Sequence, residues 1–237
     1  MELQVVIRVN DKLFLRDPNE SELGKKILRY SVDLIHNVGF EAFTFRKLAD
    51  EIGTTEAGIY RYFNNKHRLL MYLVSWYWSW LEYQLMVSTN NIPDPELKLK
   101  RIIQLLVSEE AKDFSNDFID RKKLYEIVNV EGVKSYLTKK VYDDNKAKLF
   151  QPYKDLCARI ADIFKEINPK YRYPRSLSST LLEMAHFQKF FMLHLPALTD
   201  FGEKPDAKQV VGFLESMVMS CLKKEPAIQL KAKKPRL

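Results

Sequence analysis

Residues 45–66 combine small, turn-forming and hydrogen-bonding side chains at a defined spacing. Their sequence is FRKLADEIGTTEAGIYRYFNNK. Ala49, with Gly53 four residues later and Ile59 ten residues later, fits two short helices that cross closely at a tight turn. Glycine tolerates the positive φ that such a turn needs. The second helix would open with the short or polar residues Thr55, Glu56 and Ala57, which suit a groove lined by hydrogen-bonding groups.

Two observations weigh against reading this spacing alone as a nucleic-acid site. A helix-turn-helix spacing can arise by chance in any helical bundle, where Tyr60 and Phe63 would be core residues. Residues 20–70 also hold eight basic and seven acidic residues, a net charge of only +1. The context favours a site, because three short helices are expected here before a longer helical region.

Other residue types with catalytic or metal-binding potential form no functional pattern. The sequence has no Gly-rich phosphate loop, no His-Glu-x-x-His and no Cys-x-x-Cys. His186 and His194 are eight residues apart, so packing or a subunit interface explains them better than a metal. Glu183, three residues before His186, keeps a metal site only as the weaker alternative. We expect no catalysed reaction, no metal and no cofactor.

The composition predicts an all-α protein that positions this segment. The 237 residues are 46% apolar and 29% charged, with only 7 Gly and 10 Pro. That is a folded composition with too few turn formers for an all-β protein. Apolar residues recur with helical periodicity after residue 20. The predicted helices cover about residues 20–38, 45–52, 55–63, 65–87, 95–112, 118–130, 133–150, 152–167, 176–195 and 206–223.

The first residues differ from the rest. Apolar residues alternate in the segment LQVVIRVNDKLFLR, residues 3–16, around Asn10-Asp11. This alternation predicts a short β-hairpin. An isolated hairpin is marginal in water. It should therefore pack on the protein body or pair with another strand, or it should form an arm that reaches DNA through Arg8, Lys12 and Arg16.

The last residues of the sequence carry most of its net charge. Six of the fifteen residues in 223–237 are basic and one is acidic, so most of the net charge of +7 lies in this tail. We expect a solvated tail there. No secretory signal is visible and Cys157 and Cys221 are the only cysteines, which favours a reducing, cytoplasmic compartment.

The sequence divides into four predicted regions. They are an arm at 1–19, a helix-turn-helix domain at 20–68, a helical domain at 69–223 and a tail at 224–237.

Residues 69–87 are nearly long and apolar enough to cross a membrane. A transmembrane helix needs about 20 predominantly apolar residues. Glu82 and Gln84 lie inside this stretch, and an ionised Glu in a span costs several kcal/mol. We expect a helix buried between other helices, with no membrane partner.

Several motifs resemble one known family. The residues are Thr44 to Ala49, Ile52-Gly53, Gly58 to Phe63, and Asn65-Lys66 with Leu69-Leu70. Together they are similar to the DNA-binding domain of the TetR/AcrR repressors over about residues 22–70. The ending Tyr60-x-x-Phe63-x-x-Lys66 is far rarer than a generic helix-turn-helix spacing. Residues 71–222 match the family only in the number and order of helices.

The resemblance implies a role in DNA binding for each matching residue. Arg46 would bond a guanine bidentately and Glu56 would accept from a cytosine amino group. Thr44, also a plausible N-cap by position, would present its hydroxyl to a phosphate. The residues implied to lie near base edges are Arg46, Glu56, Ala57, Gly58 and Arg61. The residues implied to contact phosphates are Thr44, Lys47, Thr55, Tyr60, Tyr62 and Lys66.

An aromatic cluster in residues 76–83 has two interpretations. Its residues could form a structural core, or they could line the ligand cavity that the resemblance implies for the helix after the DNA-binding domain. Aromatic walls predict a mostly apolar ligand. The candidate lining residues are Trp76, Trp80, Tyr83, Phe114, Tyr125, Phe150, Tyr153 and Phe187.

Apolar stripes on the last two predicted helices suggest a homodimer. One side of each helix would close the monomer core, and the excess suits an isologous four-helix interface, which the resemblance also implies. The candidate interface residues are Leu177, Leu181, Met184, Phe191, Val211, Leu214 and Val218. The expected function is a ligand-responsive repressor that binds a palindromic operator as a dimer. The alternative is a small-molecule-binding or scaffold protein with the same fold and no operator binding.

Overall fold

The computed structural model describes residues 7–107 and 118–223. The described residues form helices joined by short turns and contain no strand. The α-helices are α1 (Glu22–Ala42), α2 (Phe45–Ile52), α3 (Glu56–Tyr60), α4 (Lys66–Thr89), α5 (Pro95–Val107), α6 (Arg121–Glu131), α7 (Val141–Lys146), α8 (Gln151–Ile167), α9 (Pro174–His194) and α10 (Ala207–Lys223). The 3-10 helices are η1 (Asp11–Leu13), η2 (Pro18–Glu20), η3 (Gly132–Ser135) and η4 (Pro196–Leu198). The all-α prediction is confirmed.

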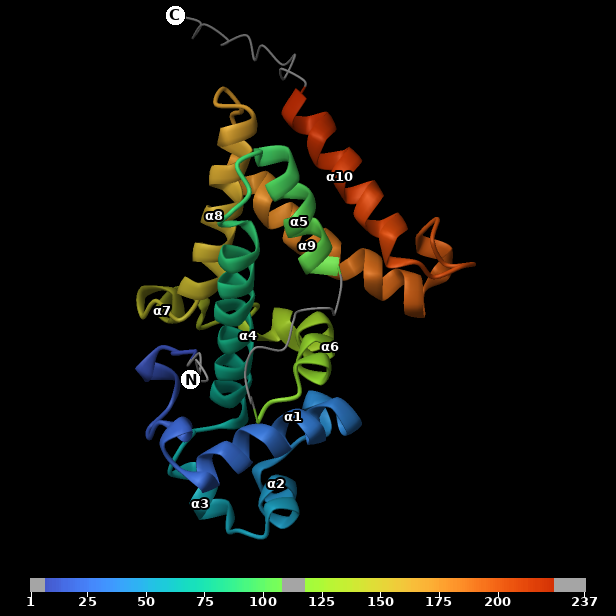
Figure 1. The fold of residues 1–237 in the computed structure, drawn as a ribbon. Helices are drawn as coiled ribbons and strands as arrows, with labels where there is room; N and C mark the ends of the chain where they lie inside the picture. Colours follow the sequence, from blue (N-terminus) through green and yellow to red (C-terminus); the bar gives the residue numbers. More distant parts are fainter. Residues whose placement is uncertain (1–6, 108–117, 224–237) are drawn as a thin grey trace, which may run out of the picture.

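The helices form a small N-terminal unit and a larger C-terminal one (Figure 1). Helices α1, α2 and α3 lie together at one end of the molecule, and α4 rises from them as a long central helix. Helices α5, α6 and α8 pack against α4, while α9 and α10 complete the larger unit. Helix α4 therefore connects the two units, so a movement of α4 in the larger unit would also shift the N-terminal unit.

Side chains cap the helices of the N-terminal unit. Ser21, Thr44, Thr55 and Asn65 each accept a hydrogen bond from the backbone N–H three residues later. This satisfies a donor that the first turn of a helix otherwise leaves without a partner. The sequence predicts the cap at Thr44. These caps fix where α1 to α4 begin, and hence which residues lie on the exposed ends of α2 and α3.

Helix α4 is buried on almost every side. Fifteen of its residues are buried, from Leu69 near its start to Thr89 at its end. Helices α5, α6 and α8 supply the surfaces that cover it. Among the described residues, no helix is long and apolar enough to span a membrane. The apolar stretch at 69–87 is a core helix, as the sequence predicts.

The first described residues are not a hairpin. Residues 7–16 contain the 3-10 turn η1 and no strand, so the predicted hairpin is wrong for this part, and residues 3–6 lie outside the described residues. Asn10 caps η1 by accepting from the Lys12 N–H at 3.0 Å, which makes a turn where the hairpin would need extended pairing. Leu13 is buried in the core. The segment therefore packs on the protein body.

The predicted helix at 133–150 is also wrong. The structure has η3, a loop and the short helix α7 there. Lys148 has a φ of 60°, which a regular right-handed helix cannot contain. The break brings the residues that follow α7 back against α4, where they form part of a cavity wall.

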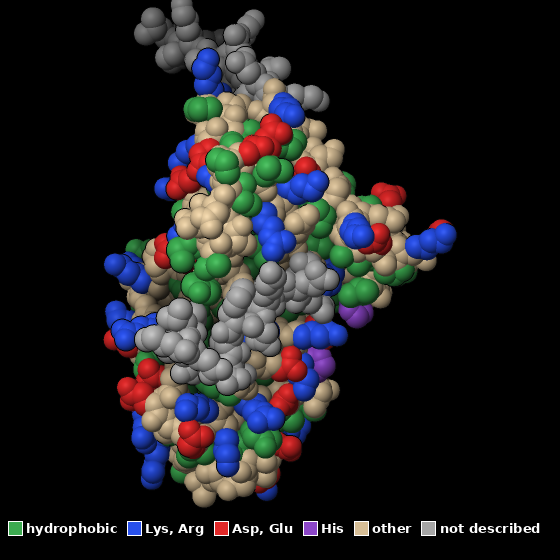
Figure 2. Space-filling model, viewed as in Figure 1, with side chains coloured by type: hydrophobic (Ala, Val, Ile, Leu, Met, Phe, Trp, Pro, Cys, Tyr) green, Lys and Arg blue, Asp and Glu red, His purple; other side chains and the backbone are tan. Residues whose placement is uncertain are grey.

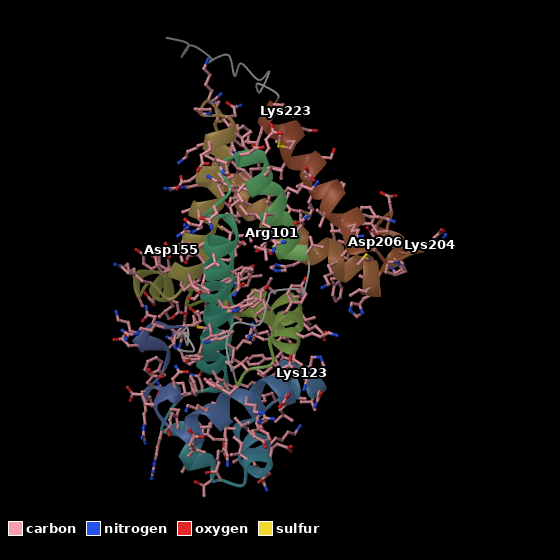
Figure 3. The ribbon with its side chains drawn as sticks, viewed as in Figure 1. Arg101, Lys123, Asp155, Lys204, Asp206 and Lys223 are labelled. Carbon is pink, nitrogen blue, oxygen red and sulfur yellow. The ribbon has the colours of Figure 1, made fainter. Side chains whose placement is uncertain are left out.

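Polar contacts join the N-terminal unit to α6. His36 lies 2.7 Å from Glu126, and Asp33 pairs with Lys123, which Figure 3 labels where α6 meets α1. Close to the end of α1, the carboxylate of Glu131 accepts from the backbone N–H of Phe40 at 3.1 Å. These contacts give α1 a second attachment to the larger unit besides α4.

Candidate nucleic-acid interface and ligand cavity

Helices α2 and α3 meet with the geometry of a helix-turn-helix. Ala49 and Ile59 are buried between the two helices, and Gly53 has a φ of 75°. The Thr54 N–H donates to the Ala49 carbonyl at 2.9 Å, which closes the turn. The small residue, the left-handed glycine and the branched apolar residue have the roles that their spacing predicts.

Helix α3 and the N-terminal end of α2 present one exposed polar surface. Most of the residues that the sequence places near DNA are exposed, and Gly58 is half-buried. Arg46 and Arg61 have no ion-pair or hydrogen-bond partner among the described residues. Figure 2 shows Lys and Arg side chains with some acidic ones on this end of the molecule. The exposed residues are Thr44, Arg46, Lys47, Thr55, Glu56, Ala57, Tyr60 and Arg61.

Tyr60 is supported from beneath by the core. Its ring meets Phe45 edge to face with 5.1 Å between centroids, and Phe45 is buried against Phe43. The side chain of Tyr60 nevertheless remains 46% exposed. A packed ring with an exposed edge suits a fixed contact to a phosphate, because little side-chain freedom is lost on binding.

Tyr62 does not belong to this surface. It is only 2% exposed, and its hydroxyl is 2.7 Å from Ser21 Oγ, the N-cap of α1. The Leu15 N–H also donates to the Tyr62 carbonyl at 2.8 Å. The predicted phosphate contact of the Tyr62 side chain is therefore wrong, because that side chain is part of the core beneath α1.

Lys66 also has a structural role. Its Nζ donates to the carbonyls of Phe40, Glu41 and Phe43 at 3.0, 3.0 and 3.1 Å. An ammonium has three N–H groups, so all its donors are used. These carbonyls lie at the end of α1, where the helix leaves such groups without a partner. The predicted contact between the Lys66 ammonium and a phosphate is wrong in this structure, because the ammonium ties α4 to α1.

A cavity of about 520 Å³ lies between α4, α8, α9 and the segment around η3. Met71, Val74 and Leu149 supply apolar parts of its wall. Trp78 meets the ring of Tyr153 edge to face at 5.0 Å. Glu183 is a carboxylate in this wall, and it accepts from the hydroxyls of Tyr153 at 2.8 Å and Tyr136 at 3.3 Å. The cavity is thus mostly apolar, with one carboxylate, Glu183, and one exposed ammonium, that of Lys154.

Only part of the predicted pocket lines this cavity. Phe150 and Tyr153 are in its wall. Phe114 lies outside the described residues. Tyr125 lines a second cavity of about 510 Å³ between α1, α6 and α9. The other predicted residues, Trp76, Trp80, Tyr83 and Phe187, do not line the first cavity.

The sequence identified the wrong side of α4. Trp76 and Trp80 are core residues, with Trp80 packed beneath the Arg121 guanidinium. Trp78 lines the cavity instead. Because α4 is buried all round, its aromatic residues give no signal for the side that meets a cavity. In the sequence, Glu183 stands out only because it precedes His186 by three residues. Its position in a largely apolar wall depends on the packing of α9, which the sequence does not show.

The predicted dimer residues are mostly internal. Leu177, Leu181, Leu214 and Val218 are buried within the single chain, and Met184 lines the cavity. These side chains cannot form an interface without opening the core, so these assignments are wrong. Phe191 and Val211 are half-buried. The apolar residues that α9 and α10 leave exposed are Phe187, Leu193 and Phe213.

Comparisons with known proteins agree with this geometry. A family model described as "Bacterial regulatory proteins, tetR family" matches residues 27–73. No curated protein sequence gives a significant match.

Solved structures resemble the chain over most of its length. A structure of AibR in complex with isovaleryl coenzyme A and operator DNA has a TM-score of 0.55 and 18% identity, covering 81% of this chain and 95% of that one. The fatty acid degradation regulator FadR from Bacillus halodurans has a TM-score of 0.57 and 19% identity, covering 81% and 92%. The ketosteroid transcriptional regulator KstR2 of Mycobacterium tuberculosis has a TM-score of 0.54 and 15% identity, covering 94% and 100%.

At these identities the structural likeness concerns the fold, while the family model matches the helix-turn-helix itself. Both agree with the buried Ala49 and Ile59 and with the left-handed Gly53. Residues 27–73 therefore match the helix-turn-helix of the tetR family of bacterial regulatory proteins, and the chain as a whole shares the fold of these solved structures.

Proposed function

We propose that the protein is a ligand-responsive transcription regulator. It binds a palindromic operator as a dimer, represses transcription there, and releases the DNA when a small, largely apolar ligand enters the cavity. The observation that carries this proposal is the exposed polar surface at the ends of α2 and α3, set on a helix-turn-helix. DNA as the partner places the protein in the cytoplasm, and no catalysed reaction is part of the proposal.

The DNA contacts follow from which side chains are exposed. Helix α3 would enter the major groove, where Glu56, Ala57, Gly58 and Arg61 would meet base edges together with Arg46 of α2. The phosphate contacts would come from Thr44, Lys47, Thr55 and Tyr60. Tyr62 and the ammonium of Lys66 are left out, because both are committed to contacts within the chain.

We expect Tyr60→Phe and Arg46→Ala to weaken DNA binding in different ways. Tyr60→Phe keeps the packing on Phe45 and removes one phosphate contact, so all sequences should lose about 1 kcal/mol alike. Arg46→Ala should cost about 1–3 kcal/mol and relax preference at one base pair. Fluorescence anisotropy with an operator duplex and its single-base variants measures both effects. Arg175→Ala, the same charge change at the start of α9, is the control, and equal losses in all three variants would refute the site.

A second copy of the chain would cover the exposed apolar surface of α9 and α10. Phe187, Leu193 and Phe213 are exposed there, and Phe213 is 43% exposed. Gly212, Ser216 and Ser220 follow one another at intervals of four on α10 and are also exposed. Small residues at this interval let two helices approach closely. An isologous pair of these helices would bury the apolar side chains in both subunits.

We expect light scattering at micromolar concentration to give twice the chain mass of 28.0 kDa. Phe213→Lys should shift the mass towards that of one chain, because it would bury a charge in the interface. Leu137→Lys, which adds the same charge at an exposed leucine before α7, should leave the dimer intact. A wild-type mass of one chain would contradict the dimer.

The cavity supports a ligand that acts through α4. Met71, Val74, Ser75 and Trp78 belong both to α4 and to the cavity wall. A ligand that binds them changes the DNA affinity only if it favours one of two positions of α4. The resembling structures include one of AibR with isovaleryl coenzyme A and operator DNA, which supports a small-molecule ligand for this fold.

The alternative function is a small-molecule-binding or scaffold protein that does not bind an operator. The near-balanced charge of residues 20–70 favours this alternative. A gel-shift experiment with genomic fragments separates the two, because the alternative predicts no retarded fragment at physiological salt.

A further inference from the structure

Within residues 7–107 and 118–223, Glu183 has no cationic partner. Its Oε1 accepts from Tyr153 and Tyr136, and no Lys, Arg or His among the described residues pairs with its carboxylate. Glu183 is half-buried beside aromatic and apolar side chains, where a cation would interact with its carboxylate more strongly than in water. A cation that enters the cavity can reach this carboxylate, since Glu183 forms part of its wall.

The other titratable groups around the cavity do not supply that charge. Lys154 also lines the cavity, but its side chain is exposed and donates to Asn145 Oδ1 rather than to Glu183. Burial lowers the pKa of His186 to about 4, so this imidazole is neutral at pH 7. Burial and the nearby charge of Glu183 raise the pKa of Tyr136 to about 12, and burial raises that of Cys157 to about 11. The phenol and the thiol therefore stay protonated, and Glu183 is the only acidic residue among those that line the cavity.

The surroundings of Glu183 are aromatic. The rings of Tyr136 and Tyr153 stack with 6.5 Å between centroids, and Trp78 meets Tyr153 from the α4 side. The faces of such rings attract cations through their quadrupoles. Ser75, on the turn of α4 before Trp78, is 5% exposed, and its Oγ has no hydrogen-bond partner. A polar group of a ligand would satisfy it.

We propose that the ligand is an organic monocation with an apolar body. Its cationic nitrogen lies against Glu183 between the tyrosine and tryptophan rings, and its body fills the apolar part of the cavity beside Met71, Val74 and Phe150. A volume of about 520 Å³ suits a ligand of this kind. This inference rests on the proposed ligand-responsive function and specifies the chemical class of the ligand.

The test compares a cation with its neutral isostere. The probes are (2-naphthylmethyl)trimethylammonium and 2-neopentylnaphthalene, which differ only in replacement of nitrogen by carbon. Equilibrium dialysis against the full chain, read by naphthalene fluorescence, gives both dissociation constants. We expect the cation to bind about tenfold or more tightly than the isostere, a factor equivalent to about 1.4 kcal/mol. Equal affinities would overturn the proposal.

Glu183→Gln tests the carboxylate itself. The amide oxygen that this substitution introduces can still accept from the tyrosines, so the variant removes the charge with little change of shape. The cation should lose about tenfold in affinity while the isostere changes less than about twofold, which also reports an intact cavity. Asp162→Asn removes a charge from the exposed side of α8 and should change neither. If Asp162→Asn weakens the cation as much as Glu183→Gln does, net charge is responsible and the proposal falls.

The proposed DNA-binding function can fail independently of this inference. Dialysis measures cation binding without DNA, so selective binding in a chain that binds no operator would refute the regulator and keep the cation site. A chain that binds an operator but does not distinguish the two probes would keep the regulator and refute the cation.

Discussion

Lys66→Met is expected to lower the stability of the N-terminal unit and to leave the DNA affinity of the folded variant nearly unchanged. The substitution keeps the apolar stem beside Phe40 but removes three donors, and the carbonyls of Phe40, Glu41 and Phe43 lose their partner. Hydrogen bonds to a charged group contribute more than neutral ones, so we expect a loss of about 2–4 kcal/mol in the free energy of unfolding. Urea denaturation followed by circular dichroism measures it.

Lys47→Met is the matched control for this prediction. The Lys47 ammonium donates to a single carbonyl, that of Ala42 at 2.8 Å, and the residue is exposed. Its loss should change the free energy of unfolding by about 0.5 kcal/mol or less. The Lys66→Met variant, measured under conditions where it is folded, should keep a DNA affinity within about threefold of wild type. That change is smaller than the loss of one charge-assisted hydrogen bond to DNA would cause. Unchanged stability with a large loss of affinity would instead restore a phosphate-contacting Lys66.

Arg68→Met is expected to cost about 3–4 kcal/mol in the free energy of unfolding, because it leaves a buried carboxylate without its partner. Arg68, in the first turn of α4, lies 3.0 Å from Asp144 of α7, whose side chain is only 5% exposed. The double variant Arg68→Met/Asp144→Leu should recover most of this loss, since two apolar side chains can replace an ion pair. A double variant as unstable as the single one would refute this explanation.

The same ion pair has a functional consequence. Helix α7 leads directly into Leu149 and Phe150 of the cavity wall, while Arg68 belongs to the helix that reaches the DNA-binding unit. The pair therefore links the cavity to the start of α4. We expect the double variant to bind DNA as wild type does but to respond less to ligand. Anisotropy with and without the cationic probe measures this response, and an unchanged response would exclude the link.

Local signals made much of the N-terminal unit predictable. Ala49, Gly53 and Ile59 act within fifteen residues of sequence, and Thr44 caps the helix that follows it directly. Such features depend on spacing and backbone conformation, which a sequence carries. Tyr62 and Lys66 were misassigned for a different reason. Their partners, Ser21 and the end of α1, lie more than twenty residues away, and only the fold brings them together.

The cavity and the outer surface depend on packing between distant helices. Trp76, Trp78 and Trp80 are all buried on α4, and only the positions of α8 and α9 determine which of them meets a cavity. Apolar periodicity on α9 and α10 identifies buried sides but does not separate a monomer core from a subunit interface. Leu181 and Leu214 proved internal for this reason, while Phe213 stayed exposed.

Selection of bound duplexes from a random DNA pool tests the central claim most directly. The wild-type chain should enrich one palindromic or pseudo-palindromic motif, with half-sites whose centres are separated by about one helical turn or a multiple of it. The Arg46→Ala chain, selected in parallel, should enrich a motif that has lost preference at one base pair of each half-site. Failure of the wild-type chain to enrich any motif would contradict operator recognition by α2 and α3. A motif unchanged in Arg46→Ala would show that Arg46 does not read a base.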